Sequence, residues 1–167
     1  IQFVAAFPAN LFYPLFVIAI VKYHLSVEIW VTPLMILGTQ WYILFNVIAG
    51  ASTIPRDLYL AADNLGLKGW IWWKRLALPG IFPFYITGAI TAAGGAWNAS
   101  IVAELVSWGN VTLTATGLGE YIQASTTAGD FPKIALGTAM MCVYVLAFNH
   151  FIWRPLYRLA EERFNLN

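Results

Sequence analysis

Charged residues are scarce in this sequence. Only 10% of its 167 residues are Asp, Glu, Lys or Arg, whereas soluble domains usually carry about 25%. So few charges cannot cover a small water-soluble globule, and a soluble all-α protein would need polar amphipathic helices that the sequence lacks. Hydrophobic residues make up 60%, and the mean hydropathy is +0.69, which excludes intrinsic disorder. The sequence predicts a membrane protein.

Reactive and ligating side chains are also few. The single cysteine, Cys142, excludes an internal disulfide. The net charge of +1 gives no reason to expect nucleic acid as a partner. Only two histidines are present, His24 and His150, and no Cys, His or carboxylate cluster has metal-ligand spacing. A phosphate loop of the G-x-x-x-x-G-K-[ST] type is missing. We therefore expect no catalytic residues, metal or cofactor, and assign any ATP chemistry to another chain or domain.

Long uncharged stretches are abundant, and they predict the architecture. Four such stretches contain 21, 27, 28 and 20 residues, and about 20 apolar helical residues cross the hydrocarbon core of a bilayer. The predicted fold is an all-α transmembrane bundle with spans at 1–21, 29–53, 78–104 and 133–153. Pro8 and Pro14 predict a kinked or broken first span. Because the chain starts at Ile1 and is apolar at once, we expect it to be a fragment with earlier spans before it.

Basic residues predict the orientation of these spans. With four spans, the segment between the second and third lies on the same side as the C-terminal tail, and this side carries seven Lys and Arg residues against two on the other side. The seven are Arg56, Lys68, Lys74, Arg75, Arg154, Arg158 and Arg163. The positive-inside rule then places residues 55–77 and the C-terminus in the cytoplasm, and residues 105–132 outside.

The cytoplasmic segment 55–77 reads as two short helices. Pro55 suits the first turn of a helix, and Asp57 complements the positive end of the helix dipole. Gly66 is placed to end this helix in the left-handed conformation. A second helix is expected around Gly69–Leu76, with Pro79 near the start of the next span. The first helix has one apolar face, because its apolar residues recur at i, i+3, i+4 and i+7. These residues are Leu58, Ala61, Ala62 and Leu65.

Two interpretations of this amphipathic helix are equally compatible with its pattern. The helix can lie flat at the membrane interface. Alternatively, its two alanines allow a groove of a partner protein to approach the backbone closely, while its leucines supply buried area. The pattern alone does not separate them.

A longer motif around the same helix resembles the coupling motif of ABC-importer permeases. Residues 60–79, LAADNLGLKGWIWWKRLALP, follow the family pattern E-A-A, three residues, G, nine residues, I-x-L-P. Leu60 stands where the family has Glu, with Asp57 and Asp63 one helical turn to either side, and Leu76 replaces Ile. The positions that match are Ala61, Ala62, Gly66, Leu78 and Pro79.

Two further stretches, WYILFNVIAGASTIP at 41–55 and AWNASIVAE at 96–104, resemble the nitrate, sulfonate and taurine branch of these permeases. The resemblance implies the C-terminal part of one permease domain of the type I importer fold. It also implies a bacterial inner-membrane location and import of a small anion such as nitrate, a sulfonate or bicarbonate. The implied partners are ATP-binding cassette subunits, a second permease half and an external solute-binding protein. Docking to the ATPase subunit is assigned to Asp57, Leu58, Ala61, Ala62, Leu65, Gly66 and Pro79.

The third span carries a small residue at every fourth position, and such residues allow close helix packing. They are Gly88, Ala92, Ala96 and Ser100. Polar residues on an adjacent strip are candidates for the translocation path, namely Thr87, Thr91 and Asn98. Hydrogen bonding to the helix's own backbone is the favoured reading for the two threonines, and both readings stay open for Asn98. Glu104 is either a site residue or a solvated carboxylate at the helix end.

The segment 105–132 is rich in Gly, Ser and Thr, and predicts a partly structured loop with a short helix near Glu120–Ala128. The alternative function is an ion-driven secondary transporter or channel. Such proteins keep ionisable residues within their spans. Here the four uncharged stretches contain only His150, which counts against this alternative.

Overall fold

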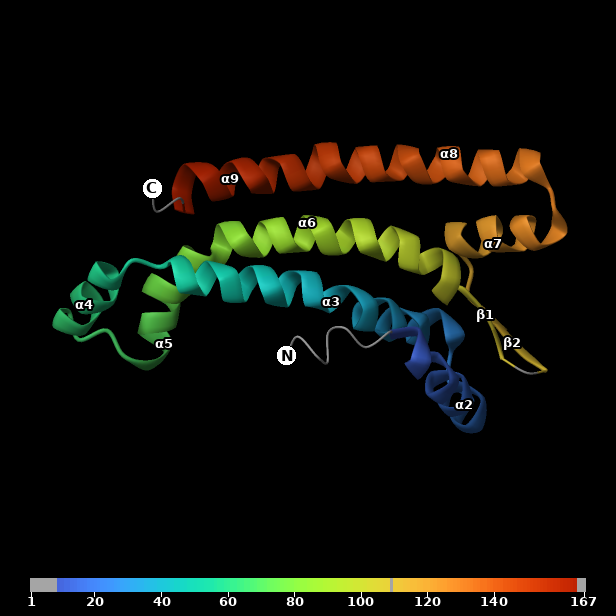
Figure 1. The fold of residues 1–167 in the computed structure, drawn as a ribbon, viewed down its shortest axis with the longest axis horizontal. Helices are drawn as coiled ribbons and strands as arrows, with labels where there is room; N and C mark the ends of the chain where they lie inside the picture. The colour runs from blue at the N-terminus through green and yellow to red at the C-terminus, as the bar shows by residue number, and fades with distance from the viewer. Residues whose placement is uncertain (1–8, 109, 165–167) are drawn as a thin grey trace. The chain divides into compact units, whose positions relative to one another are not determined.

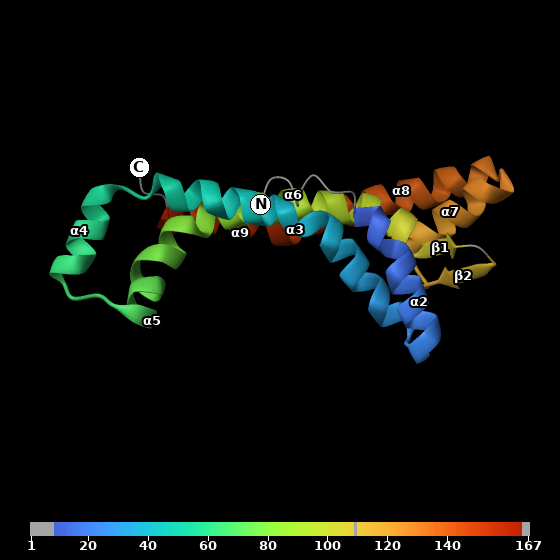
Figure 2. The ribbon, with the colours of Figure 1, turned by 60° about the horizontal axis from the view of Figure 1, so that its bottom comes forward.

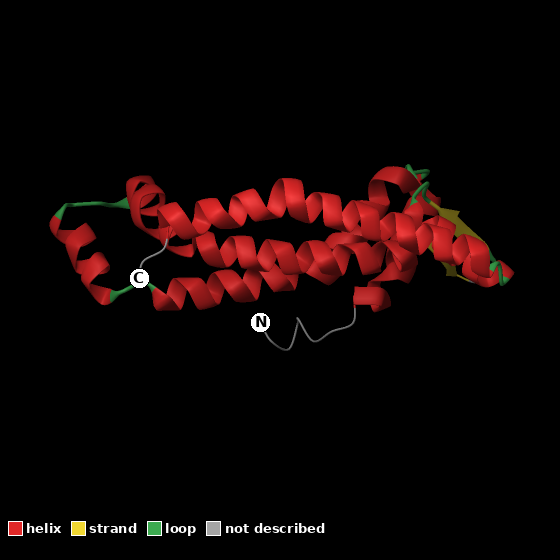
Figure 3. Cartoon of the chain, turned by 90° about the horizontal axis from the view of Figure 1, so that it is seen from above, coloured by secondary structure: helices red, strands yellow, loops and turns green. Residues whose placement is uncertain are grey.

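The computed structural model describes residues 9–108 and 110–164. Its elements are mostly helices, with one two-stranded sheet (Figures 1 and 3). The chain divides into two compact units, and three long helices each contribute to both. Unit 1 contains residues 1–41 and 93–146, and unit 2 contains residues 42–92 and 147–167.

Unit 1 begins with η1 (Ala9–Phe12), α2 (Tyr13–Tyr23) and the first half of α3 (Val27–Thr53). It continues with the end of α6 (Leu78–Ala103), strands β1 (Leu105–Trp108) and β2 (Val111–Thr114), helix α7 (Leu118–Ala128) and most of α8 (Phe131–Phe148). An apolar core joins α2, α3, the end of α6 and the strands, and its buried residues are Tyr13, Val17, Val31, Leu34, Ala103, Val106 and Ala115.

Unit 2 contains the second half of α3, helix α4 (Arg56–Asn64), and a continuous helix formed by α5 (Gly69–Trp72), the π-helical turn η2 (Trp73–Ala77) and α6. It ends with a second π-helical turn, η3 (Asn149–Trp153), and α9 (Arg154–Phe164). Within this unit α6 runs antiparallel to α3, since a Cβ at Gly88 would lie 2.9 Å from the Ile43 Cα and one at Gly50 would lie 2.6 Å from the Phe84 ring.

Among the described residues, three helices are long and apolar enough to cross a membrane: Val27–Thr53, Gly69–Ala103 and Phe131–Phe164. The second and third extend beyond the predicted spans 78–104 and 133–153, because helix continues through both π turns. Of the predicted first span, residues 1–8 lie outside the described part. The rest forms η1 and most of α2, an apolar helix of 11 residues with Pro14 in its first turn, so a fourth spanning helix is not confirmed.

The expectation of an all-α fold is wrong in the segment 105–132. Strands β1 and β2 pair antiparallel, with Leu105 opposite Thr114 and Trp108 opposite Val111. The sequence signal was available, because alternating β-branched and aromatic residues on either side of Gly109-Asn110 are typical of a hairpin with a two-residue connection. The expected short helix is present as α7, two residues longer at its start than predicted.

Candidate functional site

Helix α4 begins where the sequence predicts, with Pro55 at the N-cap rather than inside the first turn. Pro55 has φ −59° and ψ 140°, and its carbonyl accepts a 3.1 Å hydrogen bond from Leu58 N–H. Its missing N–H costs nothing there, because the first amides of a helix have no intrahelical partner. Asp57 lies in the first turn, where a carboxylate interacts favourably with the helix dipole.

The predicted left-handed glycine ends α4. Gly66 has φ +67°, and two hydrogen bonds close the helix: Gly66 N–H to the Asp63 carbonyl at 2.9 Å and Leu67 N–H to the Ala62 carbonyl at 2.9 Å. This pair of bonds is a Schellman motif, which needs a residue at positive φ. The chain then turns back through Gly69, also at positive φ, so that α4 and α5 form a helical hairpin (Figure 2).

The predicted single apolar face of α4 is divided in the structure. Ala62 is 4% exposed and forms an apolar cluster with Ile54, just after α3, and Leu76 in η2. Leu58 packs against this cluster, as do Leu67, Trp72 and Ile81. In contrast, Ala61 is exposed and Leu65 is 75% exposed. Hairpin formation explains the division, because it covers one edge of the predicted face with side chains of the following helix.

The other side of α4 carries a continuous exposed surface, which we call the outward face. Its residues recur at i, i+3, i+4, i+7 and i+8, which places them along one side of a helix. All five are exposed, and they are Asp57, Leu60, Ala61, Asn64 and Leu65. Leu60 is 54% exposed. Leu60, Ala61 and Leu65 are apolar, and the opposite side of α4 is packed against its own chain. Such an exposed apolar surface is suited to binding a partner.

The expectation of a separate helix at Gly69–Leu76 is wrong, because helix continues from Gly69 to Ala103. The π turn η2 explains how Pro79 is accommodated. Leu78 N–H bonds the Trp73 carbonyl, five residues back, and the wider turn lies directly before the proline whose ring would clash with a normal helical carbonyl. The same arrangement recurs before Pro155, where Arg154 N–H bonds the Asn149 carbonyl. Pro79 is half-buried inside the helix rather than at its start.

The polar residues proposed for the translocation path bond to their own helix. The hydroxyl of Thr87 donates to the Pro83 carbonyl at 3.1 Å, and that of Thr91 donates to the Thr87 carbonyl at 3.0 Å. Both threonines thus form the backbone bonds that the first interpretation expects, and their role in the path stays a prediction. The amide of Asn98 donates to the Gly94 carbonyl at 3.4 Å. All three side chains are exposed, on a helix that is otherwise apolar.

Glu104 has a structural partner that the sequence did not suggest. Its Oε2 accepts a 3.0 Å hydrogen bond from Glu120 N–H, in the first turn of α7, and its backbone carbonyl accepts one from Ala115 N–H at 2.8 Å. It therefore caps α7 from the end of α6, since Gly117 at the N-cap has no side chain to do so. A Cβ on Gly117 would overlap the Glu104 carboxylate. Glu104 is half-buried and has this structural contact at the helix end, and its role as a site residue stays a prediction.

Glu28 performs a similar task in unit 1. Its Oε1 accepts hydrogen bonds from Thr116 N–H at 3.0 Å and from the Thr116 hydroxyl at 2.9 Å, across 88 positions of sequence. The two glutamates fix both ends of the link between β2 and α7. Sequence reasoning could not find this pair, because an isolated Glu and Thr at such separation carry no pattern.

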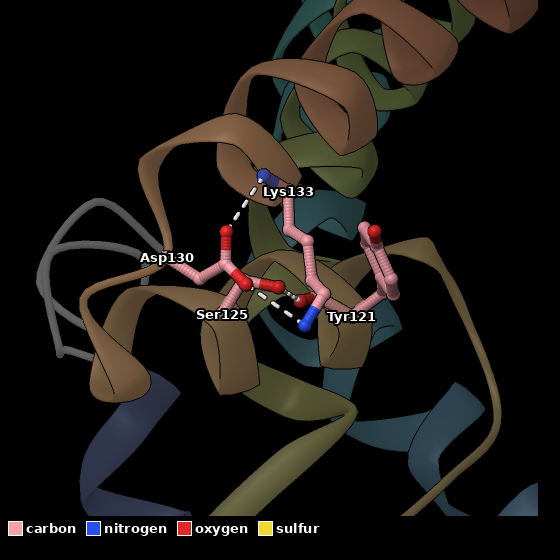
Figure 4. A network of polar contacts seen from close by, with 4 residues as sticks. All are labelled: Tyr121, Ser125, Asp130 and Lys133. Atoms are coloured by element: carbon pink, nitrogen blue, oxygen red, sulfur yellow. Dashed lines mark hydrogen bonds and ion pairs between the residues drawn. The ribbon is translucent and has the colours of Figure 1, made fainter.

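The connection between α7 and α8 is fixed by local contacts (Figure 4). Gly129 has φ +71° and ends α7. Asp130 then caps α8, because its Oδ1 accepts from Lys133 N–H at 3.2 Å and its Oδ2 lies 2.8 Å from Lys133 Nζ. These hydrogen bonds lower the pKa of Asp130 below its ordinary value. Among residues 9–108 and 110–164, no group of His, Cys, Asp and Glu could hold a metal ion.

The family model described as "Binding-protein-dependent transport system inner membrane component" matches residues 1–162. The chain is 27% identical over 109 residues to the nitrate import permease protein of Leptolyngbya laminosa, covering 65% of this chain and 37% of that protein. It is 30% identical over 131 residues to an Escherichia coli permease protein named for aliphatic sulfonates transport, covering 77% and 50%. A bicarbonate transport system permease protein of Synechocystis is 34% identical over 82 residues, covering 49% and 28%. The chain thus spans half or less of the length of these relatives.

Proposed function

The chain belongs to the binding-protein-dependent transport system inner membrane components, the permeases of ABC importers, and from this we propose that it forms one half of the path by which a small anion enters the cell. Nitrate, a sulfonate and bicarbonate are the candidate solutes, because the similar permeases are named for them. ATP hydrolysis is carried out by separate partner subunits, and a solute-binding protein delivers the anion from outside.

We assign the outward face of α4 to the groove of an ATPase subunit. The main support for this assignment is the apolar cluster through which α4 contacts the ends of two long helices. Through Ala62 it contacts Ile54 at the end of α3 and Leu76 just before α6, so two long apolar helices are joined to one short helix by a single apolar cluster. A partner that displaces α4 therefore displaces the ends of both helices, which is how closure of the ATPase subunits would reach the path.

The path itself is assigned to the side of α6 that carries Thr87, Thr91 and Asn98. Polar side chains in membrane-spanning helices usually face protein or a water-filled cavity rather than lipid, and these three are exposed in the isolated chain. A second permease half, identical or homologous, would cover this side. The side of the membrane follows from the basic residues, which put α4 and the C-terminus in the cytoplasm and the β1–β2 hairpin with α7 outside, where the solute-binding protein docks.

Three tryptophan substitutions test the assignment of α4. Ala61→Trp adds bulk to the outward face, and we expect the ATPase subunit to be lost from the affinity-purified complex while the thermal midpoint of the permease stays unchanged. Ala62→Trp overfills the buried cluster, and we expect it to lower the midpoint of the permease itself by overpacking. Ala128→Trp, at an exposed alanine of α7, is the matched control and keeps the ATPase subunit. Normal co-purification and transport with Ala61→Trp would contradict the proposal.

A further inference from the structure

A crevice in unit 2 contains no residue of the outward face of α4 and is lined by two arginines. It has a volume of about 260 Å³ and opens between α6 and the helix formed by η3 and α9. Phe82 and Phe164 close one end of this helix pair, with ring centroids 4.8 Å apart. Its lining includes Ile90, Asn149, Trp153, Arg154, Tyr157 and Arg158.

The charge of the crevice favours an anion. Arg154 and Arg158 are one helical turn apart and both line it, and the one acidic lining residue is Glu161, so the lining carries a net charge of +1. Within the described part of the chain, the only ion pair joins Lys133 to Asp130. The two guanidinium groups therefore have no carboxylate partner there. Arginine presents several N–H donors in a planar fork that matches the oxygens of a phosphate group.

The position of the crevice along the chain matches the depth of lipid headgroups. The uncharged stretch 134–153 ends just before Arg154, and five of the ten residues 154–163 are charged. On this helix the boundary between hydrocarbon and water therefore falls beside Trp153 and Arg154, which line the crevice. Trp153 and Tyr157 line the same space, and these two residue types are enriched at that boundary. Next to the crevice in sequence, exposed apolar side chains continue toward the membrane, with Phe151 74% and Phe148 43% exposed.

We propose that this crevice binds the phosphate headgroup of an anionic phospholipid, with Arg154 and Arg158 contacting the phosphate, and Asn149 and Tyr157 offering further hydrogen bonds. A free oxyanion has the same chemistry, but the exposed phenylalanines beside the arginines would gain nothing from it, whereas they provide apolar surface for acyl chains. Basic pockets between membrane helices at the cytoplasmic boundary are suited to such headgroups.

Native mass spectrometry of the purified complex that contains the full-length permease tests this inference. The probes are phosphatidylglycerol and phosphatidylcholine with the same acyl chains. We expect the wild-type protein to bind phosphatidylglycerol at least about tenfold more tightly than phosphatidylcholine. Because each basic residue contributes about 1 kcal/mol to anionic lipid binding, Arg154→Gln with Arg158→Gln should weaken phosphatidylglycerol binding about 30-fold.

Two control variants separate local chemistry from total charge. Lys22→Gln with Arg163→Gln removes the same two charges outside the crevice and should change phosphatidylglycerol binding by less than about twofold. Arg154→Lys with Arg158→Lys keeps the charge and should retain most of the binding, because lysine also binds phosphate as a point charge. Equal losses in the two Gln pairs would overturn the proposal, and so would equal binding of both lipids.

Inorganic phosphate separates the two possible sources of the anion. We expect millimolar phosphate to leave bound phosphatidylglycerol in place, since it offers no acyl chains to the exposed phenylalanines. Displacement of the lipid by phosphate at that concentration would overturn the lipid assignment. The lipid comparison on the wild-type protein requires no variant to fold, and none of these measurements depends on the identity of the transported solute.

Discussion

Both units have an apolar cluster, but among the described residues only unit 1 adds long-range side-chain hydrogen bonds to it. In unit 1, carboxylates connect segments that are far apart in the sequence: Glu28 binds Thr116, and Glu104 binds Glu120 N–H. In unit 2, α4 is held by the apolar side chains around Ala62, and the hydroxyl of Thr87 bonds to its own helix. Within the described residues, the one ion pair belongs to unit 1.

From this difference we expect that unit 1 is held by contacts within its own chain, whereas unit 2 presents groups that bind partners. Directional hydrogen bonds in unit 1 define where the hairpin and α7 start, and they tolerate water around them. The charges of unit 2, including Arg154 and Arg158, have no such partners within the described part of the chain. They remain available to a lipid or another subunit. If this comparison is right, substitutions in unit 1 should affect the fold, and those on the exposed faces of unit 2 should affect assembly.

The largest effect is expected for Gly119→Ala in unit 1. An added Cβ would overlap the backbone carbonyl of Ser100 and lie 2.6 Å from Ile101 N. Backbone atoms cannot move aside as a side-chain tip can, so we expect a loss of about 3 kcal/mol in the free energy of unfolding. The measurement is the thermal midpoint of the purified protein.

Gly94→Ala is the matched control for Gly119→Ala. A Cβ at Gly94 meets nothing within 4 Å, and alanine in the interior of a helix is favoured over glycine by about 1 kcal/mol. We therefore expect an unchanged or slightly raised midpoint. If Gly119→Ala and Gly94→Ala have the same thermal midpoint, the close approach of α7 to the end of α6 does not contribute to stability.

The next largest effect is expected when a glycine at a helix end is replaced by valine, and this effect should differ between the two units. Gly66 and Gly129 both end short helices at positive φ, +67° and +71°, and neither has an atom within 4 Å of an added Cβ. Valine at either position therefore brings the same backbone strain, about 1–2 kcal/mol. We expect Gly66→Val alone to reduce the solute transported per ATP hydrolysed, because only Gly66 shapes the proposed coupling helix.

The readout is transport and ATP hydrolysis of reconstituted complexes at matched expression. Gly129→Val should lower the thermal midpoint but keep the ratio of transport to hydrolysis. A normal ratio for Gly66→Val would show that the end of α4 is not involved in coupling, and a reduced ratio for both variants would mean that general strain, rather than position, is responsible.

The sequence predicted the features that depend on local pattern. The uncharged stretches located the long helices, the position of Gly66 predicted the left-handed end of α4, and the motif at 60–79 identified the family. Contacts that depend on folding back were not predictable. The division between Ala61 and Ala62 arises only because the Gly66–Gly69 turn returns the chain against one edge of α4. Helical continuity through Pro79 was missed because a π turn leaves no clear sequence signal.

A smaller effect is expected from removing one of the long-range carboxylates. Glu104→Ala leaves Glu120 N–H without its acceptor, and loss of a helix cap costs about 1 kcal/mol. Hydrogen exchange of the first amides of α7 should become about fivefold faster. Glu162→Ala, at an exposed position of α9, is the control from unit 2 and should leave α7 unchanged. Equal exchange in Glu104→Ala and wild type would mean that α7 is held by packing alone.

The smallest effect concerns pH and the start of α8. Hydrogen bonds from the Lys133 side chain and backbone hold the pKa of Asp130 below its ordinary value of 3.8. Because the folded-state pKa is depressed, the carboxylate's contribution is fully present above about pH 4 and is lost as the pH falls through that lower pKa. Asp130→Asn keeps an oxygen acceptor for Lys133 N–H but removes the charge. The measurement is the hydrogen-exchange rate of the first amides of α8, corrected for its intrinsic pH dependence. In the variant we expect this corrected rate to stay constant between pH 5 and pH 2. An acid response that is identical in the variant and in wild type would show that another group, rather than Asp130, controls this end of unit 1.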